Sequence, residues 1–123
     1  MRKCPRSNPK DAIGIKKSPL NLVPPALIIY AAEGMRDGAK KYGPFNWRES
    51  KVRASIYLAA AMRHLLAYLD GQELAEDSGV HHLAHAVAGL GILIDAKENR
   101  CLIDDRPLKG PAAKLLQQFT QHG

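Results

Sequence analysis

Apolar residues recur at intervals of three and four along most of the chain, which is the spacing of a helix that buries one face. The first such segment predicts a helix over residues 26–41, because Pro24-Pro25 fits a first helical turn and Gly43-Pro44 ends the pattern. Gly34 and Gly38 each weaken this helix by about 1 kcal/mol relative to alanine, but their spacing permits close contact with another helix. Its apolar stripe consists of Leu27, Tyr30, Ala31, Met35 and Ala39.

Three further helices are predicted from the same pattern. The second helix is apolar around more than half of its circumference, which indicates burial on several sides. Ser50 is its expected N-cap, and Ser78 or Asp77 is the expected N-cap of the third helix. The predicted ranges are residues 51–69, 79–99 and 112–121.

These segments predict an all-α fold, because alanine and leucine dominate the composition and no alternating strand pattern stands out. Residues 1–22 carry prolines and basic residues without an apolar period, so we expect a basic N-terminal arm, ordered only if it packs on the body or on a partner. Residues 23–123 then form a single helical domain. Because its helices have wide apolar faces, we expect a homo-oligomer in which helices of two subunits complete a four-helix-type core.

The charge and hydropathy of the chain restrict its partners and its location. Its 123 residues carry a net charge of +6, so the surface favours polyanions such as nucleic acid or the phosphates of a nucleotide. The longest apolar run, Val23–Ala32, is shorter than the roughly twenty residues that span a bilayer, so no membrane segment is expected. Since no secretory signal is visible, Cys4 and Cys101 are expected to be free thiols in a reducing cytoplasm.

Two carboxylates, those of Glu33 and Asp37, lie four residues apart and therefore on one face of the first predicted helix. Hard oxygen ligands of this kind suit Mg²⁺, which takes one or two carboxylates together with the phosphates of a substrate. The alternative interpretation is a pair of solvated acids beside the neighbouring lysines and arginine.

Cations surround the aromatic loop that follows this helix. Lys40 and Lys41 precede Phe45, Asn46 and Trp47, and further basic residues come after them. Cations can hold a phosphate while rings stack on a base, so this cluster suits a nucleotide. The alternative is that Trp47 anchors the loop in the core.

Arg63 and the histidines are the other polar residues in strongly apolar segments. An unpaired arginine is costly to bury, so Arg63 should meet a phosphate or a carboxylate such as Asp37 or Asp77. The spacing of His82 and His85 would let them share a metal, but the sequence has no HExxH or CxxC motif. We therefore expect His82 to orient another group or to contact a phosphate, and His85 to pack and form a hydrogen bond.

One composite pattern extends over about residues 20–107. It consists, in this order, of DGAKKYGPFNW (37–47), VRASIYLAAAMRHLLAYLDG (52–71), EDSGVHHLAHAVAGLGILIDA (76–96) and DDRP (104–107). The pattern resembles the phage and prophage family of dATP/dGTP diphosphohydrolases, which is related to the all-α, MazG-like nucleoside triphosphate pyrophosphatases. Several motifs in a fixed order are far more specific than any one of them.

The resemblance implies a MazG-like helical bundle that is completed by oligomerisation into a dimer or tetramer. It also implies hydrolysis of dGTP or dATP to the nucleoside monophosphate and pyrophosphate, with Mg²⁺ or Mn²⁺ as cofactor, in phage nucleotide-pool metabolism in the host cytoplasm. Such a reaction requires that the charge of the triphosphate be neutralised and that a water be placed in line with the bond that breaks.

The resemblance further implies roles for individual residues. Asp37 matches the acid before the family's G-A-x-K-Y-G motif and is the first candidate metal ligand, with Glu33 one turn away. Asp77 matches the acid of the family's D-S-G motif and is a candidate for holding a second ion or an activating water. These three acids are the candidate catalytic residues. The candidate phosphate contacts are Lys40, Lys41 and Arg63, the candidate base contacts are Asn46 and Trp47, and His64 and His82 are candidates for phosphate or supporting contacts.

Three positions depart from the family pattern, since Ala59, Gln72 and Ala75 stand where the family has carboxylates. Fewer carboxylates lower the affinity for a metal, so one alternative function is that of a nucleotide-binding protein with weakened catalysis. The net charge of +6 and the basic arm support a second, less favoured alternative, a protein that binds nucleic acid or a host factor.

Overall fold

The computed structural model describes residues 6–122, and most of the ordered elements are helices, which confirms the all-α fold class. The first predicted helix is confirmed, and the next two are confirmed with later starts. The elements are α1 (Lys10–Gly14), the short 3-10 helix η1 (Leu20–Leu22), α2 (Pro25–Tyr42), α3 (Asn46–Glu49), β1 (Val52–Arg53), α4 (Ala54–Leu69), α5 (His82–Glu98), β2 (Leu102–Ile103) and α6 (Ala112–Gln118).

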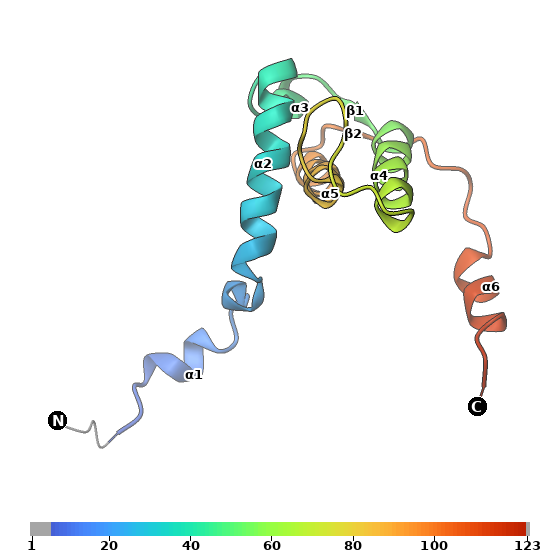
Figure 1. Cartoon of the computed structure of the whole chain (residues 1–123). Helices are drawn as coiled ribbons and strands as arrows, with labels where there is room; N and C mark the ends of the chain where they lie inside the picture. The colour runs from blue at the N-terminus through green and yellow to red at the C-terminus, as the bar shows by residue number, and fades with distance from the viewer. Residues whose placement is uncertain (1–5, 123) are drawn as a thin grey trace.

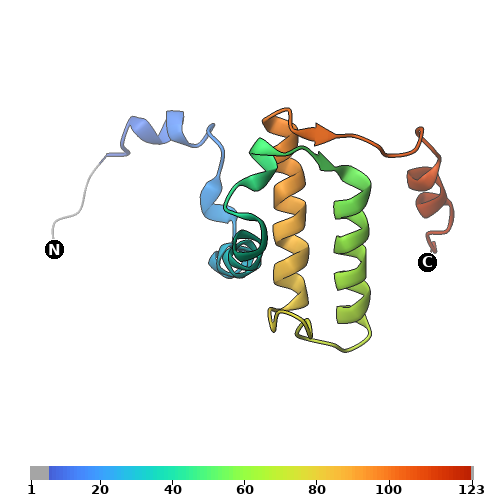
Figure 2. The same cartoon turned by 90° about the horizontal axis from the view of Figure 1, so that it is seen from above.

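Helix α5 stands between the other two long helices. It packs against α4 along one side and against α2 along another, and α4 and α5 run side by side while α2 crosses them (Figures 1 and 2). Small residues make this possible, because the buried positions of α5 include Ala84, Ala86 and Ala88. Residues two apart point to opposite sides of a helix, so burial at every second position means that α5 is covered on two sides.

A close helix contact lies where Gly34 of α2 meets α5. A Cβ atom built at Gly34 would lie 2.7 Å from the Cβ of Ala88 and would overlap the carbonyl oxygen of Ala84. Gly38, one turn further along α2, has no atom within 4 Å of the corresponding position. Of the two glycines noted in the sequence, only Gly34 is therefore required for close packing.

Two short parallel strands pair at one end of the α4–α5 helix pair, where β1 leads into α4 and β2 follows α5. Val52 of β1 lies opposite Leu102 of β2, although the sequence predicts no strand there. The predicted start of the second helix at residue 51 is wrong, because Val52 and Arg53 form β1 and α4 begins only at Ala54. Ser50 is also wrong as its N-cap, since Ser50 ends α3 and Arg53 precedes α4.

The start of α5 differs from prediction in a similar way. Neither Ser78 nor Asp77 caps it. The N-cap is His81, whose Nδ1 accepts a hydrogen bond from the backbone N–H of Leu83 at 3.0 Å. The residues before it form a tight loop instead, in which Gly79 has a positive φ of 72°.

Both ends of the described chain stand away from the three long helices. Residues 6–24 and 104–122 are all exposed, and α1 and α6 lie apart from the body in both views (Figures 1 and 2). The basic arm thus contains helices α1 and η1 but does not pack on the body. Cys101 is a free thiol, whereas Cys4 lies outside the described residues. None of the helices within residues 6–122 is long and apolar enough to cross a bilayer.

We expect Gly34→Ala to lower the free energy of unfolding by about 1–3 kcal/mol, because the added methyl group overpacks the contact with α5. Gly38→Ala is the matched control in the same helix and should raise that free energy by up to about 1 kcal/mol, since alanine favours the helix and meets nothing. Urea unfolding followed by circular dichroism measures both. Equal effects of the two substitutions would contradict the close contact.

Candidate functional site

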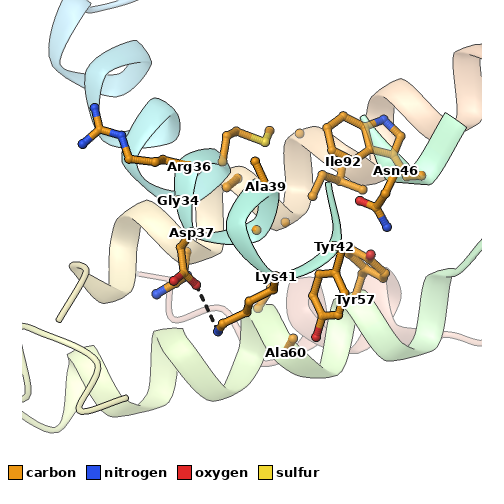
Figure 3. Close-up of a pocket in the computed structure, with 18 of the residues that line it drawn as sticks. Gly34, Arg36, Asp37, Ala39, Lys41, Tyr42, Asn46, Tyr57, Ala60 and Ile92 are labelled. Carbon is orange, nitrogen blue, oxygen red and sulfur yellow. Dashed lines mark ion pairs between the residues drawn. The ribbon is translucent and has the colours of Figure 1, made fainter. Parts of the chain in front are cut away.

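A cavity of about 890 Å³ lies between α2, α4 and α5 and is closed at one end by the loop that leads into α3. It brings together residues from four separate parts of the chain (Figure 3). Its polar lining includes Asp37, Lys41, Asn46, Arg63, His64, Asp77, His85 and Asp95, and its apolar lining includes Met35, Tyr42, Phe45, Trp47, Tyr57 and Ile92.

Charged side chains of both signs occupy the part of the cavity next to α2. Asp37 and Lys41 extend from α2 toward α4 and form an ion pair, with 3.1 Å between Oδ2 and Nζ (Figure 3). The Asp37 carboxylate raises the pKa of the Lys41 ammonium group, so the lysine stays charged. Asp77 and Arg63 line the same cavity from other elements, and no ion pair within residues 6–122 involves Arg63.

Aromatic side chains form another part of the lining. Tyr42 and Tyr57 lie beside each other in Figure 3, and burial raises the pKa of the Tyr57 hydroxyl group. Trp47 is only 8% exposed and belongs to the core cluster with Val52 and Ala96. Its ring therefore anchors the loop in the core, as the alternative interpretation expected, and it also lines the cavity, while its contact with a base stays a prediction.

Asp95 holds the aromatic loop in place from α5. Its Oδ2 accepts hydrogen bonds from Trp47 Nε1 at 2.7 Å and from Arg48 Nε at 2.8 Å, while Oδ1 accepts one from Arg48 Nη2 at 2.8 Å. These bonds, from Arg48 first and Trp47 second, lower the pKa of the Asp95 carboxyl group to about 2. The Arg48 guanidinium also lies 4.7 Å from the centre of the Phe45 ring. We call this group of contacts among Asp95, Arg48 and Trp47 the Asp95 clamp, and it fixes both aromatic residues of the loop.

Histidines gather on the side of the cavity between α4 and α5. The rings of His64 and His85 are stacked with centres 4.6 Å apart, and His64 Nδ1 lies 2.8 Å from His82 Nδ1. Burial lowers the pKa of the His64 and His85 imidazoles, which favours their neutral forms. His85 bonds to Ser78 Oγ at 2.7 Å, in keeping with the packing and hydrogen bonding expected of it.

The structure brings together seven of the ten candidate residues in this cavity and leaves three outside its lining. Glu33 pairs with Arg36 at 3.1 Å and lines a second cavity of about 260 Å³. Lys40 is exposed, and His82 is buried behind His64. The residues brought together are Asp37, Lys41, Asn46, Trp47, Arg63, His64 and Asp77.

The sequence interpretation missed Asp95, Gln72 and Tyr57. A signal existed for Asp95, because it is an acid within the otherwise apolar run GILIDA, and a carboxylate in such a run needs a partner. Gln72 bonds to His82 through Oε1 at 2.7 Å, a contact that depends on a loop conformation no spacing rule predicts.

Comparison with known proteins connects the chain to one family. The family model described as "dATP/dGTP diphosphohydrolase, N-terminal" matches residues 7–106. A curated protein named dATP/dGTP diphosphohydrolase, from Salmonella phage PMBT28, is 34% identical over 90 residues, which are 73% of this chain. The chain spans about 30% of the length of that relative. No solved structure matches. The resemblance inferred from the motifs is thereby confirmed.

We expect Asp95→Asn to loosen the aromatic loop, because the amide cannot replace the charged acceptor of Arg48 and Trp47. The folded-state pKa of about 2 is below the ordinary 3.8, so the carboxylate stabilises the fold above about pH 4 and loses this effect as the pH falls toward 2. The variant should have a lower Tm at neutral pH and a flatter Tm profile between those values. Its emission should shift to the red, since Trp47 is the chain's single tryptophan.

Asp104→Asn is the control for this measurement. The pKa of Asp104 is also lowered to about 2, by Arg106, but both residues are exposed and neither lines the cavity. This variant should leave the emission of Trp47 unchanged. If Asp95→Asn also left it unchanged, the proposed clamp would be wrong.

Proposed function

Because the chain belongs to the dATP/dGTP diphosphohydrolase family, we propose that it hydrolyses a purine deoxynucleoside triphosphate, dGTP or dATP, to the monophosphate and pyrophosphate. Its place would be the nucleotide pool of a phage-infected cell. The observation that carries this proposal is the cavity itself, in which a charged part and an aromatic part adjoin. A nucleotide has the same two parts, a polyphosphate and a base.

The charged part of the cavity suits a triphosphate. Lys41 and Arg63 supply cations, and Arg63 has no carboxylate partner among the described residues that would occupy it. Trp47, Tyr42 and Tyr57 provide ring faces on which a purine can stack, and Asn46 provides an amide that can bond to the edge of the base.

Two carboxylates of the cavity fit a divalent cation. Asp37 and Asp77 reach the same space, and Mg²⁺ is commonly held by one or two carboxylates plus substrate phosphates. Within residues 6–122, no group of three or more His, Cys, Asp or Glu side chains could hold an ion without further ligands. We therefore propose that Asp37 and Asp77 bind Mg²⁺ or Mn²⁺ jointly with the triphosphate. The ion would supply neutralising charge at the phosphates.

We expect Asp37→Asn to lower the rate of pyrophosphate release from dGTP or dATP about 100-fold or more, because it removes a negative ligand of the ion. The measurement is a panel of deoxynucleoside triphosphates with Mg²⁺ or Mn²⁺, and with EDTA as a blank. Asp11→Asn is a control on the exposed helix α1 and should retain the wild-type rate. No release from any triphosphate by the wild-type chain would overturn the proposal.

The alternative function, nucleotide binding with weakened catalysis, is supported by one contact. Lys41 neutralises Asp37, which leaves a less negative site for an ion. Calorimetry separates this alternative from the main proposal, because a binding protein would bind the triphosphate and leave it intact. Binding to DNA that weakens steeply with salt would instead favour a nucleic-acid partner.

We also propose that the chain forms a homo-oligomer. Three long helices in a layer enclose only a small core, and several of the exposed side chains of α4 are large and apolar. Leu69 is 82% exposed, and Leu66 and Met62 are more than half exposed. Contiguous apolar surface of this kind is typical of a subunit interface.

We expect light scattering after size exclusion to give a mass of about two or four times the 13.5 kDa of the chain. The double variant Leu66→Glu, Leu69→Glu should shift the mass toward that of one chain, since it places charges in the apolar surface of α4. Leu108→Glu is the control, because Leu108 is 97% exposed and lies in the loop before α6. A wild-type mass of one chain would exclude the homo-oligomer.

A further inference from the structure

A chain of hydrogen bonds runs from the surface loop to the cavity through Glu76, Gln72, His82 and His64. Glu76 Oε1 lies 3.2 Å from Gln72 Nε2, Gln72 Oε1 lies 2.7 Å from His82 Nε2, and His82 Nδ1 lies 2.8 Å from His64 Nδ1. We propose that this chain fixes the neutral His64 ring with an unprotonated Nε2 facing the cavity, where it accepts the proton of the attacking water.

The donor and acceptor of each bond in this chain follow from Glu76, its first residue. A carboxylate oxygen only accepts hydrogen bonds, so the Gln72 amide must turn its NH₂ group toward Glu76 and its carbonyl oxygen toward His82. That carbonyl oxygen also only accepts. His82 Nε2 must therefore carry a hydrogen and donate it to Gln72.

The second step fixes the tautomer of His82. The side chain is 5% exposed, and its two hydrogen-bond partners, an amide oxygen and an imidazole, carry no negative charge. A buried charge without a partner of opposite sign is costly, so the proposal assigns this ring a single hydrogen, on Nε2. Its Nδ1 is then an acceptor, and the hydrogen between the two rings belongs to His64 Nδ1.

The third step leaves His64 Nε2 with a lone pair. His64 lines the cavity, and no buried side-chain nitrogen or oxygen within residues 6–122 lacks a hydrogen-bond partner. Because none of the hydrogen bonds described includes Nε2, this atom is exposed, and the proposal places it toward the cavity that His64 lines. Stacking on His85 holds the plane of the ring.

An imidazole nitrogen with a lone pair can bond only to a group that donates a hydrogen. Phosphate oxygens are acceptors as well, so a neutral His64 in this tautomer cannot donate a hydrogen to a phosphate, which argues against the phosphate contact inferred from the resemblance. A water can donate. The groups that face His64 are His82 and His85 from α5, Asp77 from the loop and Arg63 on α4, while Asp37 and Lys41 of α2 face His85.

This inference rests on the proposed hydrolysis of a triphosphate. The water oxygen forms a bond to the α-phosphorus, and the bond from that phosphorus to the bridging oxygen of the β-phosphate breaks. The electron pair leaves on pyrophosphate, while the proton of the water passes to His64 Nε2. The resulting imidazolium can return its proton to solvent. Burial lowers the pKa of His64, so the accepting form is present at neutral pH.

Nuclear magnetic resonance tests the tautomers without any substrate. In the full chain with ¹⁵N-labelled histidine, two-bond nitrogen–proton correlations at pH 7.5 should show the hydrogen on Nδ1 in His64 and on Nε2 in His82. Gln72→Leu removes the carbonyl acceptor and should convert both rings to mixtures of tautomers. A hydrogen on Nε2 of His64 in the wild-type chain would overturn the inference.

Kinetics test the role of the lone pair. His64→Asn keeps a donor near the position of Nδ1 but loses Nε2, so kcat should fall about 100-fold or more with KM changed less than about threefold. The acidic limb of the wild-type kcat profile, expected below pH 6.5, should disappear in this variant. The substitution His122→Asn, at an exposed position, is the control and should keep the wild-type kcat and its acidic limb.

The two proposals fail in distinguishable ways. A wild-type chain that releases no pyrophosphate overturns the proposed function, and the role of His64 in it, while the tautomer measurement still decides the hydrogen-bond chain. A chain that releases pyrophosphate with an unchanged kcat in His64→Asn overturns the role of His64 alone.

Discussion

The close contact between Gly34 of α2 and the alanines of α5 is the constraint on which the rest of the structure depends. Because the two backbones approach so nearly, α2 crosses α5 at a fixed point, and Asp37 and Lys41, which follow Gly34 by one and two turns, reach toward α4. A larger residue would push the helices apart and widen the cavity. Gly34 and the alanines of α5 thus bury little surface themselves, but their close contact sets how far Asp37 and Lys41 of α2 lie from α5.

Different interactions hold the side chains on the two sides of the cavity, the aromatic loop and the histidines, so the two sides differ in chemistry. Asp95 fixes the aromatic loop through charged hydrogen bonds to Trp47 and Arg48, whereas on the histidine side the imidazole rings bond to and stack on one another. The first arrangement holds aromatic ring faces at the cavity, and in our proposal the second keeps the lone pair of His64 Nε2 available. An elongated ligand with an apolar end and an anionic end fits such a division better than a uniform polyanion does.

The body of the molecule is a layer rather than a closed core. Its buried residues are mostly alanines, while leucines, isoleucines and Met62 remain exposed on α2 and α4. The wide apolar faces predicted burial on several sides of the second helix, yet within one chain α4 is covered chiefly by α5. The remaining hydrophobic surface is what the proposed self-association would cover.

The sequence by itself determined the helices, because a 3.6-residue apolar period is a local property, and it determined the family, because several motifs stand in fixed order. It also identified most of the charged and amide side chains that line the cavity, since polar residues within apolar segments are visible without coordinates. Only the tertiary structure decided that Glu33 and Asp37 line different cavities, that Asp95 bonds to Trp47, and that Gln72 bonds to His82. These facts depend on a helix crossing and on a loop conformation, and the partners involved lie up to 48 residues apart in the chain.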